Sequence, residues 1–327
     1  MELRSSIQLP SRYKLFKTGT YSFTEETHTP QCNCNAENSN FLSRNYKALF
    51  NFLPTDCWRC KTWQVKSKNP GCGAIIYNEL INTCFENSYY TESVQQIELD
   101  LGRTFPGIKH FRKGSPGREA LRRVLTAFSK YDPQLGYVQG MNFIAGALLW
   151  HSSEVEAFWF LVGLMEDFEL RDNFLPNMPG LNKHAQITEL LIFEKLPELH
   201  RKFAEISVSA DIVITDWCFT LFANVVKVND MGCVLSGFFE AGWVFFYKLV
   251  LVILYKLQPL LLSCAESWDV LTLLKSSQNL TRALTRKLGT GVWSSLVKEA
   301  LNLSLDEKYI KYLHMNFSTE TALFKIT

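Results

Sequence analysis

Two short segments contain the residues best suited to chemistry. In the first, residues 97–106, Asp100 stands three positions before Arg103, and Pro106 closes the segment. On a helix an i,i+3 pair shares one face, so the carboxylate can hold the guanidinium in a single orientation. Pro106 disfavours helix at the residue before it. The sequence therefore predicts that Arg103 lies at a helix end or in a loop, where its side chain can project.

The second segment is residues 137–142, in which Gln139 directly precedes Gly140. Because glycine has no Cβ, the backbone of another chain or a ligand can approach closely beside the glutamine amide. A guanidinium can bridge two phosphate oxygens, and a neutral amide can both donate to and accept from water. The two segments together are suited to assisting phosphate transfer.

Other catalytic signatures are missing from the sequence. It contains no GxxxxGK[ST], GxGxxG, GxSxG or HExxH pattern. Nine cysteines and six histidines leave a thiol enzyme open as an alternative, although no local signature supports one. We therefore expect the chain not to be an enzyme with a complete site of its own.

The cysteines raise the question of a metal site. Six of the nine fall early in the chain, at Cys32, Cys34, Cys57, Cys60, Cys72 and Cys84. Cys-x-Cys followed by Cys-x-x-Cys offers four thiolates to zinc, but no second Cys-x-x-Cys stands at the spacing of a zinc ribbon or finger. Free thiols and no metal are the expectation, with a zinc site as the alternative that metal analysis tests.

Apolar residues recur at helical spacing through most of the chain. In residues 118–130 one stripe is formed by Ala120, Leu121, Val124, Leu125 and Phe128. This pattern predicts an amphipathic helix that ends at the turn formed by residues 131–133. Similar stripes recur at residues 75–85, 155–165, 187–196 and 249–257, whereas alternating runs are rare. The fold class predicted is all-α, a single large domain of many helices.

Composition divides the chain into three parts. Residues 1–40 are polar and aperiodic, which predicts a disordered, flexible N-terminal arm. Residues 41–305 are expected to form the folded domain, and residues 306–327 a C-terminal tail.

The apolar stretch 243–262 is broken by two lysines and a proline, so we expect a buried helix and no transmembrane segment. The N-terminus lacks a signal-peptide pattern, which favours a cytoplasmic protein.

The net charge narrows the class of partner. There are 34 Lys and Arg against 32 Asp and Glu, a formal net charge of +2, which argues against a nucleic-acid binder. Residues 103–123 differ from the rest, since they hold seven basic residues and one glutamate. A basic surface around Arg103 would attract an acidic partner, and solvated helix faces are the alternative for Arg122 and Arg123.

The order IxxDxxRTFP and then YxQGMN resembles the TBC domain, the catalytic module of Rab GTPase-activating proteins. Arg59 and Trp63 match the family's upstream RxxxW element, and the agreement continues through residues 156–159, 196–199 and 217–222. Three motifs in the right order are far more specific than any one of them. At Ser236-Gly237 the chain departs from the Trp-Asp pair that many members carry. The resemblance covers about residues 45–305. The departure at residues 236–237 does not touch the catalytic motifs.

The resemblance implies a mechanism with two fingers that enter the GTPase beside its bound GTP. Arg103 would neutralise charge on the transferring phosphoryl group, and Gln139 would orient the attacking water. Supporting roles fall to Asp100, Thr104, Tyr137, Gly140, Asn142, Arg59 and Trp63. Of these, Arg59 and Trp63 are interpreted as structural, because tryptophan is a large core residue. The alternative for Arg103 is an exposed ion pair with Asp100, and for Gln139 an amide on a helix surface.

The function predicted is therefore activation of a Rab-family small GTPase in its GTP form, with peripheral recruitment to membranes through partners. GTP and magnesium belong to that partner, so no cofactor is expected in this chain. The alternative is a catalytically inactive interaction module of the same fold, which binds a GTPase or another protein without accelerating hydrolysis.

Overall fold

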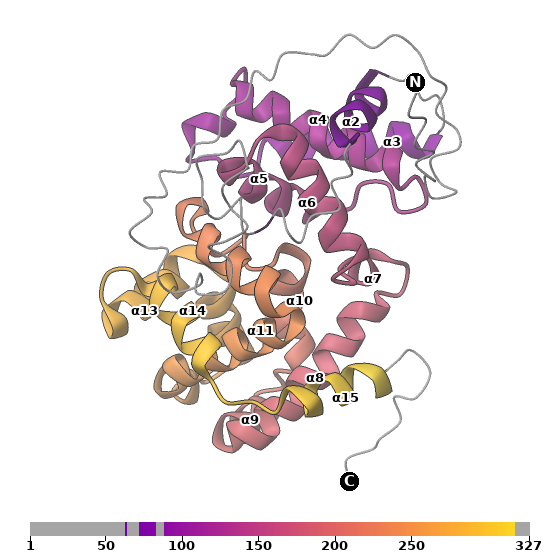
Figure 1. Ribbon diagram of the computed structural model, residues 1–327. Helices are drawn as coiled ribbons and strands as arrows, with labels where there is room; N and C mark the ends of the chain where they lie inside the picture. Colours follow the sequence, from indigo (N-terminus) through magenta and orange to yellow (C-terminus); the bar gives the residue numbers. More distant parts are fainter. Residues whose placement is uncertain (1–62, 64–71, 83–87, 318–327) are drawn as a thin grey trace, which may run out of the picture.

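The computed structural model describes residues 63, 72–82 and 88–317, and within these residues the regular elements are helices with no strand. The all-α prediction is confirmed. The first group of elements, drawn at the top of Figure 1 and continuing down through α7, comprises α2 Gly73–Asn82, α3 Ser88–Leu101, η3 Lys109–Phe111, α4 Pro116–Tyr131, α5 Met141–His151, α6 Glu154–Glu166 and α7 Arg171–Phe174.

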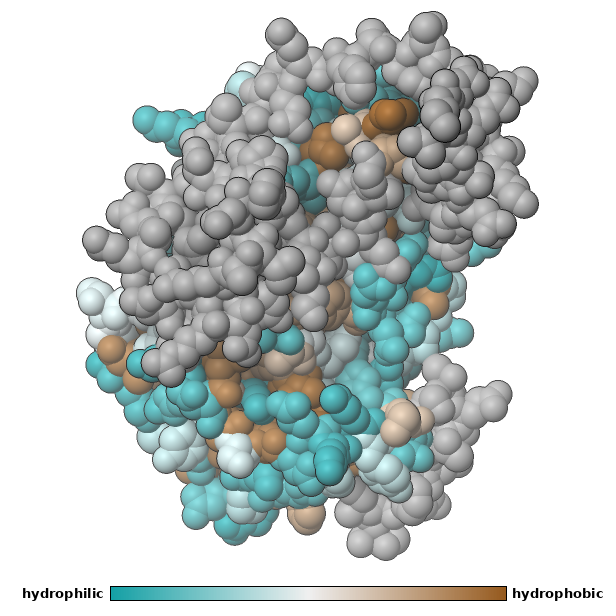
Figure 2. Space-filling view, in the orientation of Figure 1, coloured by the Kyte–Doolittle hydropathy of each residue, from teal (hydrophilic) through white to brown (hydrophobic). Residues whose placement is uncertain are grey.

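The second group occupies the lower half of Figure 1. It comprises α8 Pro179–Lys195, α9 Pro197–Glu205, α10 Ala210–Thr220, α11 Val228–Leu262, α12 Ser267–Lys275, α13 Ser277–Leu288, α14 Val292–Asn302 and α15 Glu307–Asn316. In the same orientation, Figure 2 shows hydrophilic side chains over much of the described surface of this half, with hydrophobic ones gathered among them.

Helix α4 is the centre of the first group and packs against α2, α3, α5 and α6. Its start is set by Ser115, whose side chain accepts a hydrogen bond from the Arg118 amide, and by Pro116 at the first helical position. The apolar stripe predicted for residues 118–130 is buried, and the helix ends at Tyr131 as the turn signal predicts. Burial of this stripe fixes α3 and α5, the two elements that flank the candidate site.

Helix α11 is long and apolar enough to cross a membrane, but 83% of its most apolar window is buried inside the domain. Gly242 interrupts it with non-helical dihedrals, φ 56° and ψ −137°. The flanking side chains pack against neighbouring helices, above all α14. Such burial is the pattern of a core helix, as predicted for residues 243–262.

Helix α15 lies beyond residue 305, where a C-terminal tail was expected. Ile310 and Leu313 are buried, and the helix packs against α8. The Tyr247 hydroxyl lies between His184 Nδ1, at 2.7 Å, and His314 Nε2, at 2.8 Å. Burial lowers the pKa of His314 to about 4, so its ring is neutral near pH 7. Two buried apolar residues give too weak a periodic signal to predict this helix from sequence.

Candidate functional site

Asp100 and Arg103 form the ion pair that their spacing predicts. The last turn of α3 ends at Leu101, and Arg103 Nη2 lies 2.7 Å from Asp100 Oδ1. The two side chains differ in environment, because Asp100 is 1% exposed and Arg103 is 47% exposed. A fixed carboxylate beneath the surface therefore holds a guanidinium that reaches solvent.

The Asp100 carboxylate is itself fixed by two further donors. The Tyr137 hydroxyl donates to Oδ2 at 2.6 Å, and Gln96 Nε2 donates to Oδ1 at 3.0 Å. Burial, together with the Asp100 carboxylate, raises the pKa of Tyr137 well above its usual value, so the phenol stays a neutral donor. Gln96 was not singled out from the sequence, although its i,i+4 spacing to Asp100 is a signal that could have found it.

A hydrogen-bond chain joins the two predicted segments. Thr104 Oγ1 donates to the Asp100 carbonyl at 2.8 Å and accepts from Asn142 Nδ2 at 2.7 Å. Asn142 Oδ1 accepts from the Gly140 amide at 3.1 Å. Thr104 and Asn142 are fully buried, so these bonds form in a low-dielectric environment where they are strong. The Arg103 turn and the Gln139 turn are thereby held in one arrangement.

Gln139 lies in the turn that leads into α5, and it is exposed. Its side-chain amide forms no hydrogen bond with any residue that the structure describes. Gly140 has φ 109°, a conformation that side-chain-bearing residues rarely adopt, and a Cβ there would lie 3.1 Å from the Phe219 carbonyl oxygen. The glycine is thus required for the close approach of α10 of the same chain.

The loop after Arg103 is anchored by an aromatic side chain. Phe105 has φ 45°, so it is not helical, although its left-handed backbone differs from the extended one that a residue before proline usually adopts. Its ring packs against Phe111 and Phe143, each with ring centroids 5.7 Å apart. A left-handed phenylalanine is uncommon and persists only where packing enforces it. This packing stops the loop from drifting away from the ion pair.

Trp63 lies in the core, with none of its surface exposed. Its ring packs against Phe239, with centroids 5.3 Å apart, and its indole nitrogen donates to Ser236 Oγ at 3.1 Å. A Cβ at Gly237 would lie 2.4 Å from the Phe245 ring. The Ser236-Gly237 departure is therefore accommodated, because serine accepts the indole hydrogen bond and glycine leaves room for the phenylalanine. Arg59 lies outside the described residues.

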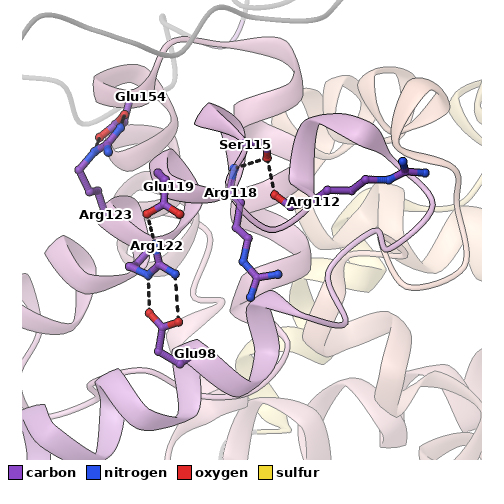
Figure 3. Close-up of polar contacts among 8 residues, drawn as sticks. All are labelled: Glu98, Arg112, Ser115, Arg118, Glu119, Arg122, Arg123 and Glu154. Atoms are coloured by element: carbon purple, nitrogen blue, oxygen red, sulfur yellow. Dashed lines mark hydrogen bonds and ion pairs between the residues drawn. The ribbon is translucent and has the colours of Figure 1, made fainter.

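The basic residues in the segment 103–123 fall into two groups, those that form ion pairs and those that do not. Figure 3 shows Arg122 between Glu98 and Glu119, and Arg123 against Glu154 at 2.7 and 2.6 Å. The hydrogen bond from Arg122 lowers the pKa of Glu98, which keeps that carboxylate charged. Four other cations form no ion pair within the part of the chain that the structure describes: Lys109, Arg112, Lys113 and Arg118. We call these four residues the basic patch.

Metal chemistry receives no support from the described residues. The described cysteines are free thiols, at Cys72, Cys218, Cys233 and Cys264. No group of three or more His, Cys, Asp or Glu side chains that could hold a metal ion occurs among the described residues. The other early cysteines, at Cys32, Cys34, Cys57, Cys60 and Cys84, lie outside them.

The chain matches a known protein family over more than half of its length. Residues 56–262 match the family described as the Rab-GTPase-TBC domain, and both turns of the candidate site lie inside this match. The chain belongs to this family. The resemblance inferred from the motifs is thereby confirmed, although the match does not test the role of any single residue.

Two relatives show how much of the chain the similarity covers. An ecotropic viral integration site 5 ortholog from Drosophila melanogaster is 34% identical over 159 residues, which is 48% of this chain and 20% of that protein. The Rab GTPase-activating protein eat-17 from Caenorhabditis elegans is 31% identical over 169 residues, 52% of this chain and 19% of that protein. This TBC chain therefore spans about a fifth of the length of these two curated relatives.

Solved TBC structures have the same fold. The Ypt/Rab-GAP domain of Gyp1p superposes with a TM-score of 0.56 at 18% identity, covering 73% of this chain and 79% of that one. The Chlamydomonas flagellar RabGAP TBC domain gives a TM-score of 0.52 at 23% identity, covering 77% and 86%. At these identities the similarity shows the fold alone.

Proposed function

We propose that this TBC chain is a GTPase-activating protein that acts in trans on a Rab-family small GTPase. The observation that carries the proposal is the Asp100–Arg103 pair, in which a buried, doubly anchored carboxylate presents an exposed guanidinium. The chain of bonds through Thr104 and Asn142 couples this pair to the turn that exposes Gln139.

The two side chains divide the chemistry. Arg103 neutralises charge that develops on the transferring phosphoryl group, a contribution of roughly 10³ to 10⁵ in rate, or about 4 to 7 kcal/mol of barrier. Gln139 orients the attacking water through its amide. The nucleotide and magnesium belong to the GTP-bound partner, and the chain supplies no cofactor. The protein thus completes the partner's site rather than possessing one of its own.

The basic patch supports the same partner class. Because Arg122 and Arg123 are paired with glutamates, the unpaired cations that follow Arg103 in this segment are those of the basic patch, of which Lys109, Arg112 and Lys113 are exposed. In Figure 3 the Arg112 side chain extends away from the other labelled residues. Exposed cations beside a docking site raise the association rate with an acidic partner surface. We infer that they attract the nucleotide-bearing face of the GTPase, in the cytoplasm and on membranes to which partners recruit the protein.

A panel of Rab proteins tests this proposal directly. Each Rab is loaded with GTP and mixed with the full chain, and phosphate release is followed under single-turnover conditions. We expect strong acceleration on at least one Rab, and a clear loss of rate in Gln139→Ala with the melting temperature unchanged. Arg201→Ala, which removes an exposed side chain on α9, serves as the matched control and should keep the full rate.

The interaction-module alternative predicts a different outcome of the same experiment. A Rab that binds the chain in its GTP form but hydrolyses GTP at its intrinsic rate would support it. Intact acceleration in Gln139→Ala would instead remove the glutamine from the mechanism while leaving the activator role in place.

A further inference from the structure

A groove lies among α11, α12 and α13, away from the candidate site. It has a volume of about 630 Å³ and is lined on its apolar side by residues that include Leu257, Leu260, Trp268 and Leu273. In Figure 1 α13 is drawn in the lower half of the molecule, whereas α3 and α4 are drawn in the upper half. The residues that line the groove include neither Arg103 nor Gln139, so the groove is a separate surface.

The groove exposes apolar side chains that a soluble helix normally buries. Trp268 is 71% exposed and Leu260 is 49% exposed. Trp268 stands out among the described tryptophans, because it alone is classed as exposed. An indole beside a concave surface is typical of protein interfaces, where tryptophan is enriched among the residues that dominate binding energy.

The groove has more cations than carboxylates among its lining residues. Arg282 and Arg286 lie one turn apart on α13, both are exposed, and neither forms an ion pair with a described residue. At this spacing both guanidinium groups lie on one face of α13, so they present two positive charges to the groove.

The other charged groups of the groove already have partners within the chain. Lys256 pairs with Glu299 at 2.7 Å, and Lys287 donates to the Lys256 carbonyl at 2.7 Å. The groove's carboxylate, Asp269, accepts from the backbone amides of Ala265 and Glu266 and so caps α12. Arg282 and Arg286 therefore remain as the groove's exposed cations that form no ion pair or side-chain hydrogen bond with a described residue.

We propose that this groove docks an acidic segment of a partner protein. An aliphatic or aromatic side chain of the segment packs on Trp268 and Leu260, and its carboxylates pair with Arg282 and Arg286. Guanidinium recognises carboxylate in a planar, two-bond geometry, and tryptophan with arginine is the composition of interface hot spots. The concave shape favours an inserted side chain over the flat surface of a membrane. The proposal is independent of GTPase activation.

Peptide display on the intact protein tests it. A random library of 15-residue peptides is selected against the full chain, and the affinities of the enriched peptides are measured. We expect enrichment of Asp and Glu around one or two large apolar residues. Trp268→Ala should weaken binding at least about tenfold, as expected for a hot-spot residue, and Arg282→Glu with Arg286→Glu should abolish it.

Matched variants control for charge and for folding. Lys195→Glu with Arg201→Glu reverses two exposed cations outside the groove, and Tyr312→Ala removes an exposed aromatic ring on α15. Both should leave peptide binding unchanged. Because the altered groove side chains are exposed, their variants should keep the melting temperature of the wild type.

Each of three results would overturn the proposal. In the first, selection yields no peptide with acidic enrichment. In the second, the acidic peptides bind the groove variants as well as they bind the wild type. In the third, the chain sediments with phosphatidylserine vesicles but not with phosphatidylcholine vesicles, loses this binding in the groove variants, and selects no acidic peptide. That outcome would make the groove a membrane-facing surface.

Discussion

Two arginines of this protein have the same local sequence pattern and very different surroundings. Arg103 follows Asp100 by three residues, and Arg122 follows Glu119 by three residues. Arg103 pairs with a carboxylate that is 1% exposed, whereas the carboxylate of Glu119 is 43% exposed. Arg122 is also held by Glu98 from α3, so its guanidinium is saturated with carboxylates.

The same sequence motif thus serves two purposes. An exposed ion pair between helices contributes about 0 to 1 kcal/mol, because solvent screens it and both side chains lose entropy. A buried carboxylate with several donors cannot move, so it fixes the direction of the guanidinium that reaches out from it. The Asp100 pair is suited to positioning a reactive group, and the Arg122 pair is suited to joining α3 to α4.

Substituting Arg103 should have the largest effect on GTP hydrolysis. Arg103→Lys should lower single-turnover GTP hydrolysis on the best Rab by roughly 10³ or more, because lysine keeps the charge but loses the planar fork. Rab binding and the melting temperature should change little, since the side chain is about half exposed and lysine keeps its charge. Full acceleration by Arg103→Lys would show that this arginine has no finger role.

Asp100→Asn tests whether the buried carboxylate positions Arg103. Asparagine keeps the shape and can still accept from Tyr137, but it lacks the charge that holds the guanidinium. We expect kcat to fall by about 10- to 100-fold, the cost of a misplaced catalytic group, with KM for the Rab nearly unchanged. A rise in KM at constant kcat would instead assign Asp100 to the docking surface.

Charge reversal in the basic patch should give a smaller effect that depends on salt. Arg112→Glu with Lys113→Glu should lower kcat/KM by about tenfold at low ionic strength through slower association. The loss should nearly vanish at about 1 M salt, where the Debye length is ~3 Å. Lys195→Glu with Arg201→Glu is the matched control, and an equal loss in that control would mean that only net charge matters.

The smallest effect is expected at Arg122. Arg122→Ala removes the surface pairs with Glu98 and Glu119 and should cost about 0.2 to 1 kcal/mol of unfolding free energy. The hydrolysis rate should stay within about twofold of wild type, less than 0.5 kcal/mol of barrier. Thermal unfolding and the Rab assay measure both quantities. A loss of activity comparable to that of Arg103→Lys would erase the distinction between the two arginines.

Much of the fold could be predicted because it depends on local spacing. The stripe in residues 118–130 predicted α4 to within a few residues, and the broken apolar stretch 243–262 predicted a buried helix. Pro106 placed Arg103 beyond the end of α3. Helix α15 was missed, because its two buried residues become informative only when α8 is present to pack against the helix.

The sequence by itself determined the family, the helical class and the types and order of the site residues, because motifs and periodicity are properties of neighbouring positions. Only the tertiary structure decided which distant side chains interact with one another. Tyr137 reaches Asp100 across 37 positions, and Arg123 reaches Glu154 across 31. It also placed Phe219 against Gly140. These choices depend on which helix faces pack together, and that packing is set by burial of the whole core rather than by any local pattern.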